Sequence, residues 1–250
     1  MLRSLKDFVQ YAVEADDGNI GYVDNFYFND EHWTIRYIIV ETARFLFGKK
    51  VLISPRLVKD EPDWENHQFE IDLTKEQIKN SPDIDLARPV SREKEIELAQ
   101  YYQWPMYWND YTEPFLPYYV SFLHTREVSE ETNEPDSQNE NHLRSLKEIL
   151  NYHVNAINGD IGQISDVIVD DIHWKIQFFA VNIKDYHPGK KVLISPSWIN
   201  KIDWNSSSIF LDHSITEIIE SFEYTPSEPV NLKLEKTFYD YYGRPSRPLS

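Results

Sequence analysis

The chain has 250 residues, no cysteine and a formal net charge of -17 at pH 7. This excess of acid argues against nucleic-acid binding, because neutralising phosphates requires clustered Lys and Arg. The lack of cysteine excludes a disulfide framework, thiolate catalysis and cysteine-bearing metal sites. A hydrophobic fraction of 41% supports a folded core, whereas no secretory signal and no apolar run of about 20 residues is found. We therefore expect a cytoplasmic protein with no membrane span.

An internal duplication organises the chain. The sequence LRSLK at 2–6 recurs at 143–147, and the sequence GKKVLISP at 48–55 recurs at 189–196. The matching positions continue for roughly a hundred residues, which is longer than the units of solenoid proteins. We therefore interpret the repeat as a duplicated domain.

This duplication predicts the domain organisation. We expect a first repeat at 1–123 that includes a helical and aromatic extension, and a second repeat at 142–250 with a shorter extension. The residues between them, 124–141, are rich in Glu, Asn, Ser and Thr and have almost no large apolar side chain. Such a composition cannot bury enough surface to offset the entropy of ordering, so this segment is predicted to be a flexible acidic linker.

Alternating apolar and polar residues predict short strands early in each repeat. In the first repeat, the turn at 16–19 contains Gly18, which can adopt a positive φ. Pro55 is expected to stop a strand, because it cannot donate a hydrogen bond to a neighbouring strand. The predicted strands are 11–15, 20–29, 33–41 and 50–54, with 56–58 and 68–73 as two further candidates.

Short helices are predicted to follow the strands. Thr74 and Gln77 fit a capping box, and Ser214 and Glu217 repeat it in the second copy. Residues 92–103 have helical composition, with apolar side chains spaced for one packed face. Several short strands with regular turns and little helix favour a small barrel. The predicted fold is therefore mainly β, with five or six strands and short helices in each repeat.

The order of three motifs resembles the PRC-barrel family: Gly18-x-Ile20-Gly21, then His32-Trp33, then the GKKVLISP segment. The resemblance implies two tandem small PRC-type β-barrels. Such barrels occur in the cytoplasmic part of the photosynthetic reaction-centre H subunit and in a ribosome-maturation family, where the barrel serves assembly or interaction and is not an enzyme. This chain lacks the membrane-spanning helix of the H subunit and the excess of basic residues expected of a protein that binds ribosomal RNA. It is therefore more similar to stand-alone bacterial PRC-barrel proteins.

The residues that could carry chemistry favour structural interpretations. The Asp-x-His pairs at 30–32 and 171–173 could hold a divalent ion, but a polar hairpin turn before a buried Trp explains them better. Ser54 and Ser195 are predicted to end strands and lack a nucleophile elbow. The glycines recur in pairs at turns and form no phosphate-binding loop. We therefore expect no enzyme activity, no cofactor and no metal.

The two repeats differ most after their helical segment, where only the first continues into a stretch dense in aromatic residues and proline. This stretch is predicted either to pack against a barrel or to form a partner or subunit interface, because aromatic residues are enriched at interfaces. The candidate interface residues are Trp104, Tyr107, Trp108, Tyr111, Phe115 and Tyr118.

Two functions from different classes are compatible with these features. The first is a non-catalytic protein-interaction or assembly module with an unknown protein partner. The second is a small-ligand or metal-binding protein with a site between the barrels or at the aromatic segment. A role in RNA processing or ribosome assembly is less favoured, because the charge opposes it. Both a homodimer and pairing of the two repeats within one chain are possible.

Overall fold

The computed structural model describes residues 1–42, 46, 48–59, 62–84, 90–106, 143–183, 186–221 and 223–225. We call the described residues up to 106 the first half and those from 143 onward the second half. The predicted linker at 124–141 lies outside the described residues, so the domain boundaries stay a prediction. The same holds for five of the predicted interface residues: Tyr107, Trp108, Tyr111, Phe115 and Tyr118.

The first half contains six strands, one 3-10 helix and three α-helices among its described residues. From residue 12 onward their positions agree closely with the predicted elements, except that the candidate strand at 56–58 is wrong; β1 (Leu2–Ser4) and α1 (Leu5–Phe8) were not predicted. That segment forms a 3-10 helix, because Pro55 occupies its first turn and the Ser54 side chain caps it. The elements are β1 (Leu2–Ser4), α1 (Leu5–Phe8), β2 (Ala12–Ala15), β3 (Gly18–Asn29), β4 (Thr34–Glu41), β5 (Lys50–Ile53), η1 (Pro55–Leu57), β6 (Gln68–Glu70), α2 (Lys75–Lys79) and α3 (Arg92–Tyr102).

The second half repeats this order of elements up to the short helix that matches α2. It adds one strand, β12, where the first half forms only isolated bridges. The predicted capping boxes at the starts of α2 and α6 are both present. The elements are β7 (Leu143–Ser145), α5 (Leu146–Ile149), β8 (His153–Ala156), β9 (Gly159–Asp170), β10 (Lys175–Asn182), β11 (Lys191–Ile194), η2 (Pro196–Trp198), β12 (Ile199–Asp203), β13 (Ser208–Leu211) and α6 (Ile215–Ile219).

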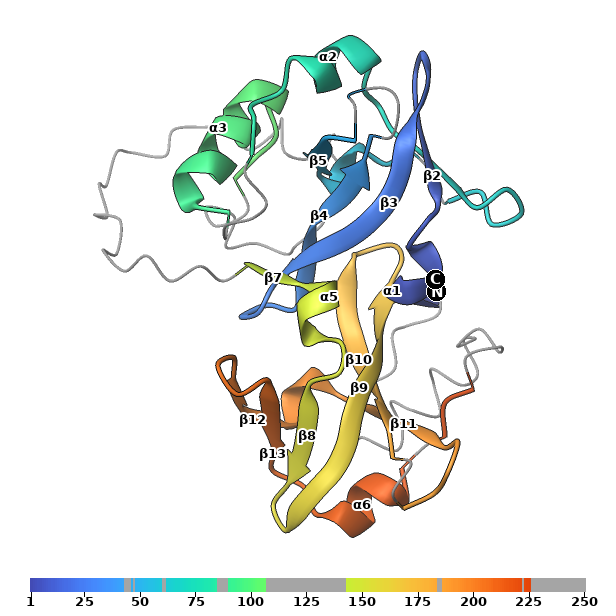
Figure 1. The fold of residues 1–250 in the computed structure, drawn as a ribbon, viewed down its shortest axis with the longest axis vertical. Coiled ribbons are helices and arrows are strands. Elements are labelled where there is room, and N and C mark those ends of the chain that lie inside the picture. Colours follow the sequence, from blue (N-terminus) through green and yellow to red (C-terminus); the bar gives the residue numbers. More distant parts are fainter. Residues whose placement is uncertain are drawn as a thin grey trace, which may run out of the picture.

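The thirteen described strands belong to one sheet that runs through both halves. Each half contributes a meander in which a long strand, β3 or β9, pairs with the strand before it and the strand after it. The halves exchange strands, because β1 of the first half pairs with β9 and β7 of the second half pairs with β3. Figure 1 shows the first half above the second, with the two long hairpins meeting between them.

The prediction of a mainly β protein is confirmed. The prediction of two separate closed barrels is not confirmed. The sheet does not close, because β1 of the first half pairs with β9, and β7 of the second half pairs with β3. The path of the sheet also passes directly from one half to the other, where Lys175 of β10 pairs with Thr34 of β4.

Gly21 and Gly162 allow the long strands to bend close to the end of the next strand. A Cβ atom at Gly21 would lie 1.9 Å from the Glu41 carbonyl oxygen, and one at Gly162 would lie 2.0 Å from that of Asn182. Both residues have positive φ, at 149° and 145°. Only glycine combines this conformation with so close a backbone approach. Gly21 and Gly162 are therefore required by the backbone, although they lie inside β3 and β9 and not at turns.

The main hydrophobic core is continuous across both halves. Strands β4 and β10 are buried on both faces, so their side chains alternate between this core and a second apolar layer. In β4, Ile38 and Val40 face the main core, while Tyr37 and Ile39 belong to a layer that includes Leu98 of α3. The helix α3 therefore covers the outer face of the first half's sheet.

Candidate functional site

The repeated LRSLK sequence forms a short arm at the start of each half. We call residues 2–8 the first arm and residues 143–149 the second arm. In each arm a strand of three residues leads into one helical turn, because a serine side chain, Ser4 or Ser145, caps the helix. The apolar residues that follow the cap are buried, including Leu5 and Phe8. Each arm therefore presents a strand edge to the other half and buries a small hydrophobic anchor.

Each arm docks on the long strand of the opposite half. Leu2 pairs with Asp170 of β9, and Leu143 pairs with Asn29 of β3. The capping serines also bind across these junctions. The Ser4 hydroxyl donates to Asp166 over 2.7 Å. At the other junction the Asn25 amide donates to the Ser145 hydroxyl over 2.8 Å.

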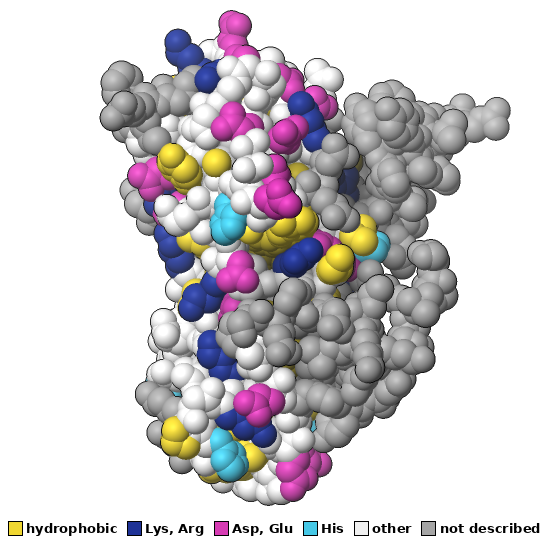
Figure 2. Space-filling view, turned by 90° about the vertical axis from the view of Figure 1, so that its right-hand side faces the viewer, with side chains coloured by type: hydrophobic (Ala, Val, Ile, Leu, Met, Phe, Trp, Pro, Cys, Tyr) yellow, Lys and Arg dark blue, Asp and Glu magenta, His cyan; other side chains and the backbone are white. Residues whose placement is uncertain are grey.

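An arginine on each arm lies between an aromatic ring of its own half and an acid of the other half. The Arg3 guanidinium lies 3.8 Å from the centre of the Trp64 ring, and its Nε is 3.3 Å from Asp171. Arg144 repeats the arrangement, at 4.1 Å from the Trp204 ring and 3.0 Å from Asp30. A guanidinium suits this position, because it can stack on a ring and bind a carboxylate at the same time. Figure 2 shows hydrophobic and basic side chains together at mid-height, where the halves meet.

The hairpin tips of the two halves carry the Trp residues of the repeated His-Trp motif. Trp174 is buried among Phe8, Phe26 and Phe69, all from the first half, with ring centres 6.0 to 6.3 Å away. Trp33 packs edge-on against Phe179 of the second half at 5.2 Å. Each tip therefore inserts an indole ring toward the core of the opposite half.

The backbone at both tips is held in an unusual conformation. Trp33 and Trp174 have φ values of 56° and 52°, a region that bulky residues rarely adopt. Two hydrogen bonds hold the tips against each other: Ile35 N–H donates to the Trp174 carbonyl at 2.8 Å, and Ile176 N–H donates to the Trp33 carbonyl at 2.7 Å. The contacts between the halves therefore stabilise a conformation that costs energy locally.

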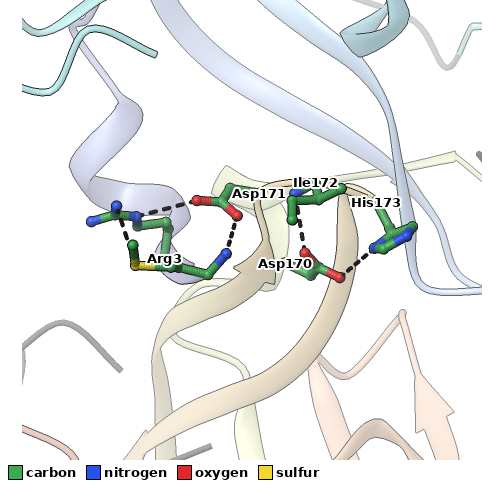
Figure 3. Close-up of polar contacts among 6 residues, drawn as sticks. Arg3, Asp170, Asp171, Ile172 and His173 are labelled. Carbon is green, nitrogen blue, oxygen red and sulfur yellow. Dashed lines mark hydrogen bonds and ion pairs between the residues drawn. The ribbon is translucent and has the colours of Figure 1, made fainter. Parts of the chain in front are cut away.

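The Asp-x-His motif of the second half does not converge on one point. His173 Nδ1 lies 2.8 Å from Asp170, which also accepts a hydrogen bond from the Ile172 N–H at 3.1 Å. Asp171 points the other way and binds Arg3 and the amino group of Met1 (Figure 3). Within the described ranges, no three His, Asp or Glu side chains are grouped as metal ligands. Asp170 and His173 therefore order the hairpin tip, while Asp171 joins the tip to the first arm.

Comparison with models of known protein families identifies one domain in the chain. Residues 3–78 match the family model for the PRC-barrel domain. The chain contains a PRC-barrel domain. None of the curated proteins matches the chain. The matched range runs from the first arm to α2, so it includes every strand of the first half apart from the first residue of β1.

Among the described helices of this PRC-barrel protein, none is long and apolar enough to cross a membrane. The recognised domain does not close on itself. Its arm lies on β9, and its core contains Trp174 of the second half.

Charge is distributed differently beneath the two arms of the PRC-barrel protein. Asp24 on β3 binds Lys147 of the second arm at 2.6 Å and Lys50 at 2.8 Å. Burial raises the pKa of Asp24, but the hydrogen bonds from Lys147 and Lys50 outweigh burial, and the pKa is lowered overall. Asp166 on β9 is instead buried beneath the first arm, and burial raises its pKa despite the hydrogen bonds from Ser4 and the Val167 N–H.

Trp104 is the one predicted interface residue that lies within the described residues. Its ring stacks on Tyr102 at 4.8 Å and lies 6.3 Å from Tyr37. Burial also raises the pKa of Tyr102 to about 12. Trp104 therefore packs at the end of α3, which agrees with the packing interpretation for this residue. The rest of the predicted aromatic interface stays a prediction.

A group of apolar side chains on the second half was not predicted from the sequence. We call Ile157, Tyr186 and Phe210 the end patch; they are 69%, 40% and 38% exposed. Phe210 lies beside Asn155, which pairs in turn with Asp160, and the Tyr186 hydroxyl donates to the Asp160 carbonyl at 2.8 Å. Ile157 follows Asn155 by two residues and lies in the turn directly after β8. The end patch therefore consists of three exposed apolar side chains at one end of the second half, with the polar residues Asn155 and Asp160 between Phe210 and Tyr186.

Proposed function

We propose that this PRC-barrel protein is a non-catalytic interaction or assembly module, and that the end patch binds a protein partner. The observation that carries the proposal is the group of three exposed apolar side chains at one end of the second half. Single exposed hydrophobic residues are common, but several large ones grouped at one end of a domain and rimmed by polar residues are typical of an interaction site. Aromatic side chains are also enriched among the few residues that contribute most of the binding energy at protein interfaces.

The first half supplies an internal comparison for this surface. There β6 pairs with β2 as β13 pairs with β8, and Glu70 lies beside Glu14 where Phe210 lies beside Asn155. The turn after β2 carries Asp16, which binds Lys59 at 2.6 Å, where the second half has Ile157. The fold therefore accepts acidic residues at these positions. The apolar residues of the end patch are not needed to form the sheet.

The comparison provides a direct test. We expect the double substitution Ile157→Asp with Phe210→Glu to leave the melting temperature nearly unchanged, because the first half carries the same residue types there. A tagged full-length chain should recover a stoichiometric protein partner from native lysate, and the double variant should recover at least tenfold less of it. The readout is quantitative mass spectrometry after mild cross-linking.

Tyr22 offers a matched control. It is 47% exposed on the first half, and the second half has Gln163 at the equivalent position in its long strand. The substitution Tyr22→Gln removes a similar exposed aromatic ring at another place, so it should leave partner recovery intact. Equal recovery by the wild-type chain and the double variant, or no stoichiometric partner at all, would contradict the proposal.

A further inference from the structure

We propose that a second copy of this chain is one partner of the protein, and that two copies associate by exchanging halves. In such a dimer the first half of one chain pairs with the second half of the other, and the remaining two halves pair in the same way. The inference deepens the proposed assembly role by naming a partner. It rests on the junctions between the halves and makes no use of the end patch.

The first step of the argument is that the described contacts between the halves resemble those between subunits. Each half places its own arm on the long strand of the other, and each inserts a tip Trp toward the other's core. The contacts are reciprocal and non-covalent. They do not depend on which chain supplies the opposite half.

The second step is that each arm carries the same binding groups. Both present an arginine, a serine and a lysine in the same order, and both tips present an aspartate to the arginine. The lysines find an acceptor in either half, since Lys6 donates to the Ser165 carbonyl at 3.1 Å and Lys147 binds Asp24. Either junction can therefore form between two chains.

The third step concerns the competition between pairing within a chain and between chains. The halves are joined covalently through residues 107–142. A tether raises the effective concentration of the attached half to the order of millimolar for short flexible linkers. Exchange is therefore favoured when chains fold at high local concentration. It is also favoured when both junctions within a chain are weakened, which is how elements exchange in domain-swapped dimers.

Two complementary variants make exchange the only way to satisfy every junction. The arm variant carries Arg3→Glu and Arg144→Glu, so both of its arms meet acidic tips in the same chain. The tip variant carries Asp30→Arg and Asp171→Arg, so both of its tips meet basic arms in the same chain. In an exchanged dimer of one arm variant with one tip variant, all four junctions bring opposite charges together.

We expect the two variants, purified after co-expression of full-length chains, to form a heterodimer with twice the mass of one chain by light scattering. The dimer should melt at a higher temperature than either variant alone. The control is one chain with all four substitutions, whose charges are paired internally; it should be monomeric and melt above either double variant, but below the wild type because Arg3 and Arg144 no longer stack on Trp64 and Trp204. If the control folds and the mixture of variants yields no heterodimer, the proposal is wrong.

Wild-type chains provide a second, independent measurement. Two copies with different affinity tags are unfolded together in urea and refolded by dilution at increasing protein concentration. We expect copurification of the tags to rise at least tenfold between micromolar and near-millimolar chain, and to persist after dilution, because release requires opening the shared core. If the tags do not copurify at any concentration, exchange is overturned. The end patch could still recover a different protein in its own assay, so the two proposals fail separately.

Discussion

The two junctions use the same arm sequence but place a carboxylate differently beneath it. On β3, Asp24 is partly exposed and binds two lysines, while the next residue, Asn25, faces inward and binds Ser145. On β9 the carboxylate is at the inner position instead: Ser165 stands at the position equivalent to Asp24, and Asp166 stands at the position equivalent to Asn25. Side chains alternate between the faces of a strand, so a shift of one position moves the charge from solvent to interior. We therefore expect the same residue type to stabilise one junction and, in its charged form, to weaken the other.

The largest expected difference in stability between the two halves is at the hairpin tips. Trp174 is 5% exposed and surrounded by aromatic rings of the first half, whereas Trp33 is only half-buried. We expect Trp174→Ala to lower the free energy of unfolding by about 3–5 kcal/mol, the usual cost of removing a buried Trp. Trp33→Ala should cost clearly less. Urea unfolding followed by far-UV circular dichroism measures both, and equal losses would show that the two tips are equivalent.

The order of local elements could be predicted from the sequence, because alternation, turn residues and caps act between near neighbours. Thr74 with Gln77 and Ser214 with Glu217 form the expected capping boxes, and α3 ends within one residue of the predicted helix. The strand at 56–58 was wrong because the cap at Ser54 favours a 3-10 turn. Local rules could not have given the exchange of arms, since an arm sequence has the same local preferences whichever half it meets.

The candidate site shows the same limit. The repeats of LRSLK and His-Trp were visible in the sequence, but their partners are more than 100 positions away, and no local pattern predicts such pairings. The end patch leaves a usable signal in the sequence. Comparing the two repeats position by position gives Asp16 against Ile157 and Glu70 against Phe210. Such differences between copies identify surfaces that the fold itself does not require.

Asp24, which binds Lys147 of the second arm, is expected to stabilise its junction. Its lowered pKa means that the folded protein favours the charged form, so its contribution is present above pH 3.8 and is lost as pH falls through the folded pKa. Asp24→Asn should therefore cost about 1–2 kcal/mol at pH 7, after allowance for the exposure of its lysine partners. The cost should shrink on acidification below pH 3.8 and in high salt. Asp83→Asn is the control, because Asp83 is 82% exposed beside Lys49; an equal loss there would contradict the assignment.

Substitution of Asp166 has the smallest expected effect on stability, and it is expected to stabilise the protein where substitution of Asp24 destabilises it. Burial raises its pKa, and nearby Asp7 raises it further, while Ser4, the Val167 N–H and Lys6 lower it. A raised pKa means that the favourable contribution is complete below pH 3.8, the value for the free side chain, and is lost as pH rises through the folded pKa.

Asp166→Asn should therefore stabilise the protein near pH 7, by about 1 kcal/mol on the scale of a buried polar group. The gain should decrease toward pH 4. The reciprocal substitution Asn25→Asp buries a carboxylate at the equivalent position and should destabilise the protein at pH 7. Melting temperatures of both variants between pH 4 and pH 7.5 test the pair. A loss of stability for Asp166→Asn at neutral pH would mean that the charged carboxylate strengthens the junction, and that the two junctions depend on charge in the same way.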